Sequence, residues 1–257
     1  MATDFKKILS IDIGVRNLGV SVVEYHCVPP YSQWENLKIT QLELVDIVEE
    51  SQKGKKVRAG SKPKNAKTLN IHVLCNTLVQ ILLNRKHWLD GVTDIRVEQQ
   101  PLMRGRSTGS AGSSRMKVIQ HCILTFYETY YSIHTECAKP TIQPASPANK
   151  LKCIIDMTNF ATKPLEKTDK DTDYKQRKAK AVEGFGKIIQ KCTISDAHKH
   201  LYEDRKKHDD LADCILQAVY ELQCHVCKLL SDAAKPATKK TRKVKKLKCN
   251  NDNGDGG

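Results

Sequence analysis

The acidic residue with the most unusual sequence context is Asp12, in the segment ILSIDIG at residues 8–14. The residues around it form a short apolar run of mostly β-branched side chains, which predicts a strand covered on both faces. A carboxylate inside such a strand loses its hydration and needs a partner, because otherwise it costs several kcal/mol or stays protonated. A divalent cation removes this cost. We therefore predict that Asp12 is a metal ligand held rigidly by a buried strand.

Three further acids are candidates to join Asp12. Glu98 ends the short apolar run IRVE, which predicts a second strand, although an exposed charge at a strand end is the alternative. In the segment HDDLADC, Asp210 and Asp213 are three positions apart. On a helix their Cβ atoms lie about 5–6 Å from each other on one face. The neighbouring Asp209 points about 100° away from Asp210. Both Asp209 and Asp210 could instead favour the helix N-terminus through its dipole.

Carboxylate oxygens are the ligands that Mg²⁺ or Mn²⁺ takes. Two such ions about 3.5–4 Å apart can activate water and stabilise the leaving oxygen during phosphodiester hydrolysis. The acids therefore predict a site with two Mg²⁺ ions, which Mn²⁺ can replace. The candidate ligands beside Asp12 are Glu98, Asp210 and Asp213.

The charge of the chain favours a polyanionic partner. The 257 residues carry a formal net charge of +14, and nucleic acid explains such a surplus better than a membrane does. A general solubility bias is the alternative. Basic residues gather in a predicted insertion at 51–67, in a Gly/Ser/Arg loop at 104–115, and in a C-terminal tail at 231–257 that we expect to be disordered.

The location expected from the sequence is an intracellular, reducing compartment. The start MATDFKK has no apolar leader region, and no apolar segment approaches the roughly 18 residues that span a bilayer. The ten scattered cysteines are expected to be free thiols. Host-cell cytoplasm (for a viral protein), nucleus and mitochondrion are not distinguished.

The elements that must position the acids alternate between strands and helices, which predicts a mixed α/β sheet with helices on its faces in one domain over residues 1–230. We expect a β-hairpin over 7–25, strands over 37–45, 94–99 and 137–144, and helices over 69–89, 116–132, 146–156, 174–191 and 208–230.

An acid on the first strand, an acid on a later strand and paired acids on the last helix form a pattern that resembles the RNase H-like fold. More narrowly, the chain resembles the RuvC-like Holliday junction resolvases of the poxvirus-type and fungal mitochondrial branches. The segments that carry this resemblance are IDIGVRNLGV (11–20), VEQQPLMRGRS (97–107), SSRMKVIQ (113–120), QRKAKAVEGF (176–185) and KHDDLADCILQA (207–218).

The resemblance implies an RNase H-like mixed sheet that begins with an antiparallel hairpin and continues with parallel strands. It implies a Mg²⁺-dependent endonuclease that resolves four-way DNA junctions by paired symmetric nicks and leaves 5′-phosphate and 3′-hydroxyl ends. It also places the four metal-binding acids of the family on the four acids named above.

The resemblance further implies a phosphate-holding lysine near the last helices and a homodimer formed through helix 116–132. The candidate lysines are Lys150, Lys178 and Lys180. Arg104, Arg106, Arg115 and Lys117 are expected to contact DNA, together with Lys150. The aromatic wedge of RuvC is replaced here by Pro101, which puts that function in doubt.

Three alternatives stay open. The first keeps the fold but acts on an RNA–DNA hybrid or as a transposase-like enzyme. The second is an actin-like ATPase or sugar kinase, whose first hairpin also begins DxG; against it, those folds are duplicated and need a second glycine-rich phosphate turn. The third is a DNA-binding module without catalysis, and the presence of all four acids in order counts against it.

Overall fold

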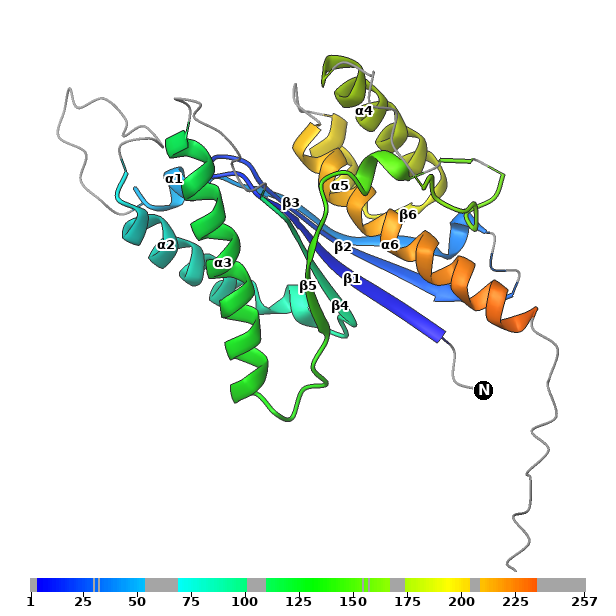
Figure 1. Cartoon of the computed structure of the whole chain (residues 1–257), viewed down its shortest axis with the longest axis horizontal. Helices are drawn as coiled ribbons and strands as arrows, with labels where there is room; N and C mark the ends of the chain where they lie inside the picture. Colours follow the sequence, from blue (N-terminus) through cyan, green and yellow to red (C-terminus); the bar gives the residue numbers. More distant parts are fainter. Residues whose placement is uncertain are drawn as a thin grey trace, which may run out of the picture.

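The computed structural model describes residues 4–29, 31, 33–53, 69–100, 110–153, 155–156, 158–166, 174–203 and 209–234. A six-stranded sheet with the strand order β5-β4-β1-β2-β3-β6 lies at its centre (Figure 1). The strands are β1 (Asp4–Asp12), β2 (Leu18–Cys27), β3 (Leu37–Val45), β4 (Asp94–Glu98), β5 (Thr141–Ala145) and β6 (Thr193–Ile194).

The pairing of the strands confirms the predicted fold class. The first three strands form an antiparallel meander, in which β1 pairs with β2 and β2 with β3. Strands β4 and β5 then add in parallel beside β1, and the short β6 adds in parallel beside β3. Because β1 and β4 are parallel and Ile11 lies opposite Val97, their carboxyl ends meet at one edge of the sheet.

Helices cover both faces of this sheet (Figure 1). One face carries α1 (Ile47–Glu50), α2 (Ile71–Asn84) and α3 (Ser110–Ile133). The other carries α4 (Tyr174–Lys191), α5 (Asp196–Glu203) and α6 (Asp209–Ala233). Short 3-10 turns lie at Trp34–Asn36, Lys86–Leu89 and Lys150–Lys152.

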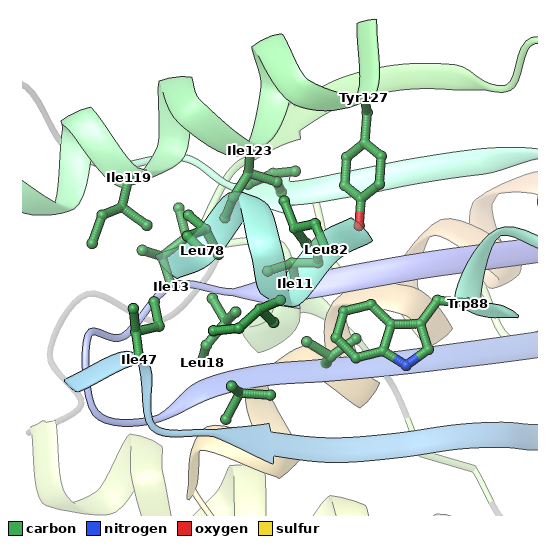
Figure 2. Close-up of a cluster of buried hydrophobic side chains, with 14 of the residues drawn as sticks. Ile11, Ile13, Leu18, Ile47, Leu78, Leu82, Trp88, Ile119, Ile123 and Tyr127 are labelled. Carbon is green, nitrogen blue, oxygen red and sulfur yellow. The ribbon is translucent and has the colours of Figure 1, made fainter. Parts of the chain in front are cut away.

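Two apolar cores lie on the two faces, because side chains alternate along a strand. Leu9 and Ile11 of β1 join the core beneath α2 and α3, where Ile119, Ile123 and other buried side chains converge (Figure 2). Ile8 joins the second core, beneath α4 and α6. By the same alternation Asp12 faces α6, and both faces of its strand are covered, as predicted.

Two sequence predictions were wrong. The predicted loop at 104–115 is helical from Ser110 onward, and the Arg115 guanidinium donates to the Leu69 carbonyl at 2.7 Å near this end of α3. The predicted helix over 146–156 is only the 3-10 turn Lys150–Lys152. At the end of this turn, the Leu165 backbone N–H donates to the Lys152 carbonyl at 2.9 Å, so a bond from outside the segment takes a carbonyl that a helix reaching residue 156 would use. The buried Trp34 indole N–H also donates to the Asp156 carbonyl at 2.6 Å.

The other predicted boundaries lie closer to those of the observed elements. The helix predicted over 69–89 ends at Asn84, the strand predicted over 137–144 is β5, and α6 continues to Ala233. The sequence did not predict α1, α5 or β6. Most of the basic insertion, from residue 54 onward, and the tail from 235 onward lie outside the described residues.

Each of the nine cysteines within the described ranges carries a free thiol. Among the helices that the structure describes, none combines the length and the apolar character of a membrane-spanning segment.

Candidate active site

The four predicted acids line one pocket of about 320 Å³. Asp12 ends β1, Glu98 ends β4, and Asp210 and Asp213 lie in the first turns of α6. The structure therefore brings together carboxylates that are up to 201 positions apart in the chain. The remaining residues that line the pocket are Pro147, Lys150, Leu151, Arg177, Lys178 and Ala181.

The two strand acids are fixed by the sheet. Asp12 follows Ile11, and Glu98 follows Val97, which pairs with Ile11 across the parallel ladder. Asp12 is only 7% exposed. Burial, followed by the negative charge of Glu98, raises the pKa of Asp12 well above its ordinary value of 3.8. The site therefore favours a cation beside Asp12 over an isolated carboxylate.

The two helix acids reach the site because α6 begins very close to β2. A Cβ added to Gly19 would lie 2.6 Å from the Asp210 carbonyl oxygen and 3.5 Å from the Asp12 Cβ atom. No side chain fits between strand and helix at this point. Burial, followed by the charge of Asp209, raises the pKa of Asp210. Burial also raises the pKa of Asp213, against the opposing effect of the Lys150 ammonium group.

Lys150 lies among three of the acids. Its Nζ atom is 3.5 Å from Asp12 Oδ1 and 3.3 Å from Glu98 Oε1, and it donates to Asp213 Oδ2. Burial lowers the pKa of Lys150, but the surrounding carboxylates outweigh this effect and raise it above its ordinary value. The ammonium group is therefore charged and compensates the acids.

The other predicted cations are distributed around the site. Lys178 lines the acid pocket and pairs with Asp209, for which the sequence had suggested only a role at the helix N-terminus. Lys180 lines an adjoining pocket of about 260 Å³, whose wall includes Arg177 and Lys150. Arg115 and Lys117 belong to α3 and do not line the acid pocket. Arg104, Arg106 and the wedge position Pro101 lie outside the described residues.

A solved structure shares this architecture. The yeast mitochondrial Holliday junction resolvase Ydc2 matches with a TM-score of 0.51 at 16% sequence identity, over 89% of this chain and 84% of that chain. The chain has the RNase H-like fold of this resolvase. RuvC of Thermus thermophilus matches with a TM-score of 0.48 at 10% identity, over 85% of this chain and 95% of that one.

The complex of fowlpox virus resolvase with its substrate Holliday junction DNA matches with a TM-score of 0.45 at 14% identity, over 85% of this chain and 98% of that chain. The assignment of the RNase H-like fold rests on the yeast enzyme. The sequence matches no protein-family model and no curated protein.

The donor chemistry of this RNase H-like site fits hard divalent cations. The four acids offer carboxylate oxygens, which are the ligands of Mg²⁺ and Mn²⁺. In the described part of the chain, no three His, Cys, Asp or Glu side chains converge closely enough to hold a metal ion as they stand. The Lys150 ammonium group lies between three of the acids instead. The acid pocket therefore already attracts and holds a positive group.

Two glutamines that support the site, Gln100 and Gln217, were not predicted from the sequence. The Gln100 side chain donates to Glu98 Oε2 at 2.9 Å, and the Gln100 backbone N–H donates to Gln120 Oε1 on α3 at 3.0 Å. On α6, Gln217 donates to the Ser10 hydroxyl at 2.9 Å and to the Arg96 carbonyl at 3.2 Å. Gln217 comes four residues after Asp213 and lies on the same face of its helix, which is the signal that could have identified it.

Replacing Gln217 by leucine should destabilise the protein by about 1–3 kcal/mol, because the buried Ser10 hydroxyl and Arg96 carbonyl lose their donor. Urea unfolding followed by circular dichroism measures this loss. Gln190→Leu, on the exposed face of α4, is the matched control and should change stability by no more than about 0.5 kcal/mol. Equal effects of the two substitutions would show that Gln217 does not anchor α6 to the sheet.

Proposed function

We propose that the chain is a Mg²⁺-dependent, structure-selective endonuclease that resolves four-way DNA junctions by paired symmetric nicks. The observation that carries this proposal is the convergence of Asp12, Glu98, Asp210 and Asp213 on one pocket, within the fold of a mitochondrial Holliday junction resolvase. Hydrolysis would leave 5′-phosphate and 3′-hydroxyl ends.

The four acids would hold two metal ions. When bound, such ions supply activation of the attacking water and stabilisation of the leaving oxygen. Asp12 and Glu98 form the rigid half of the site, since each ends a strand of the central sheet. Asp210 and Asp213 form the half that α6 positions. Arg177 and Lys178, on the wall of the same pocket, are placed to hold the scissile phosphate.

The net charge of +14 supports sequence-independent contacts with the DNA backbone. On the described surface, Arg177 and Lys180 extend the positive charge from the acid pocket into the adjoining pocket. We retain Arg104, Arg106, Arg115 and Lys117 as proposed DNA contacts.

A homodimer is the assembly that fits paired nicks. Its two-fold axis would relate two active sites, in the same way that a two-fold axis relates the two cut strands of a junction. The outer face of α2 and α3 carries an apolar groove of about 590 Å³. Three side chains in it are unusually exposed for their type, namely Leu83 (36%), Val118 (43%) and Ile133 (70%). The predicted pairing helix, over 116–132, lies within α3 and forms one wall of this groove.

Replacing Ile133 by lysine is expected to convert the proposed dimer into a monomer and to abolish paired nicking, since it would bury a charge in the apolar face that the two copies share. Sedimentation velocity measures the mass, and a cruciform plasmid distinguishes paired from single nicks. Leu230→Lys is the matched control, because Leu230 is 39% exposed but lies near the end of α6, away from the groove. A parent protein that is monomeric at all concentrations would exclude this dimer.

The proposed function is tested by incubating the full chain and Mg²⁺ with labelled four-way junction, Y-fork, duplex and RNA–DNA hybrid, and mapping the nicks on each strand. Nicks at opposing positions of the junction would support the resolvase. Scattered cutting of duplex indicates a general nuclease, and preferential cutting of the hybrid indicates an RNase H-type enzyme. Binding of ATP without binding of DNA would favour the ATPase or kinase alternative.

A further inference from the structure

Lys150 occupies the centre of the acid pocket. It begins the 3-10 turn Lys150–Lys152 and inserts its side chain between the ends of β1 and β4 and the start of α6. The Lys150 side chain is 12% exposed, and the side chains of Asp12 and Glu98 are 10% and 14% exposed. The cation and its partners are therefore largely shielded from water.

Water does not compensate carboxylates that are buried this deeply. Three of them within reach of one ammonium group would repel one another strongly if that group were absent, because the attraction or repulsion of charges about 4 Å apart is several times larger in a protein than in water. A divalent cation bound to Asp12, Glu98 and Asp213 would need the same oxygen atoms that Lys150 now contacts. The ammonium group and the metal therefore compete for one place.

We propose that Lys150 is the resident counter-ion of the metal-free site and that metal binding displaces it from the acids. The lysine keeps Asp12, Glu98 and Asp213 together before the metal arrives, and its removal from them is part of the free energy of metal binding. This inference rests on the proposed function only in taking the acids as the metal ligands. It gives Lys150 a positioning role that does not depend on contact with DNA.

The first test measures metal affinity without DNA. Isothermal titration calorimetry with Mn²⁺ alone compares the full-length parent with Lys150→Met and Lys152→Met. Lys152 lies on the same turn but does not line the acid pocket. The dissociation constant should fall at least about tenfold in Lys150→Met, because the metal no longer displaces a cation from low-dielectric surroundings. Lys152→Met should change it by about threefold or less, because a screened charge acts weakly at a distance.

The second part of this test measures stability by thermal unfolding. Lys150→Met should melt below the parent in the absence of metal and should gain more from saturating Mn²⁺ than the parent does. A Lys150→Met protein that folds only with Mn²⁺ is the same result in its extreme form. Equal Mn²⁺ affinity in Lys150→Met and Lys152→Met would overturn the proposal.

An independent measurement uses only the parent protein. It tests whether bound metal displaces Lys150 from the acids even if Lys150→Met does not fold with or without metal. Acetic anhydride modifies exposed, uncharged amines, and mass spectrometry reports the rate at each lysine. Lys150 should react slowly in the metal-free protein and several times faster with saturating Mn²⁺, while Lys152 should react equally in both. A Lys150 rate that does not respond to bound Mn²⁺ would also overturn the proposal.

Failure of the inference is distinguishable from failure of the proposed function. None of these three measurements contains DNA, so displacement of Lys150 by Mn²⁺ in a protein that cuts no junction would leave the counter-ion role intact and exclude the resolvase. Junction cleavage by the parent, together with an Mn²⁺ affinity that Lys150→Met does not change, would exclude the counter-ion role and leave the resolvase intact. Absence of Mn²⁺ binding in the parent and in both variants would exclude both.

Discussion

Replacing Asp12 by asparagine is expected to abolish junction cleavage while leaving junction binding intact. Asparagine keeps the size of the side chain but removes one negative charge and one strong metal-binding oxygen from the most buried acid of the pocket. Loss of a supporting residue around a metal typically costs about 10–100-fold, so loss of a proposed ligand should cost at least about 1,000-fold in the cleavage rate. Binding should persist because basic side chains outside the acid cluster supply most of the contacts with phosphate.

Single-turnover cleavage of a labelled four-way junction in Mg²⁺ measures the rate, and an electrophoretic mobility shift in Ca²⁺ measures binding. Asp90→Asn is the matched control, since Asp90 is exposed and lies at the start of the turn before β4. It should cleave at the rate of the parent. An Asp12→Asn protein that binds and cleaves as the parent does would show that this cluster is not catalytic. A parent protein that binds the junction but does not cut it would instead favour the non-catalytic DNA-binding module.

The central part of the fold could be predicted because it depends on local patterns. Strand β3 and helix α4 begin and end where the apolar pattern placed them. The hairpin of β1 and β2 follows from two apolar runs joined by a short turn with Gly14, whose added Cβ would lie 2.3 Å from the Asn17 carbonyl oxygen. Near residue 150 the local pattern was not decisive, since the bonds to Lys152 from Leu165 and to Asp156 from Trp34 come from outside the segment. Tertiary contacts of that kind override helix propensity.

The candidate site was also predictable only in part. The membership of the four acids was predictable, because each has an unusual local context and their order resembles a known family. Their mutual geometry was not predictable from the sequence. The bonds from Gln217 to β1 and β4, the ion pairs of Lys150 and the contact of Gly19 with α6 all join segments more than 50 positions apart. The sequence also placed Lys178 and Lys180 together as candidates, and only the structure separates them into adjoining pockets.

Replacing Gly19 by alanine should then test whether the close approach of α6 to β2 sets the geometry of the site. The added methyl group would lie 2.6 Å from the Asp210 carbonyl oxygen, which is backbone and cannot rotate away. The first turn of α6 must therefore shift away from β2 and carry Asp210 and Asp213 with it, while Asp12 and Glu98 stay in the sheet. A displacement of about 1 Å at a catalytic centre can cost roughly 100-fold in rate, and overpacking of this kind costs about 1–3 kcal/mol in stability.

Cleavage kinetics and urea unfolding separate the two effects, and Gly184→Ala is the matched control. Gly184 is also buried, but a Cβ added there meets its nearest neighbour, Ile155 Cγ1, at an ordinary 3.4 Å. Alanine in this helical position should maintain or raise stability. If Gly19→Ala were to lose only stability and cleave at the parental rate once folded, the acids of α6 would tolerate displacement and could not be ligands in a tightly specified two-metal site. If the cleavage rate fell by more than the fraction of folded protein, cleavage would depend on the position of the first turn of α6.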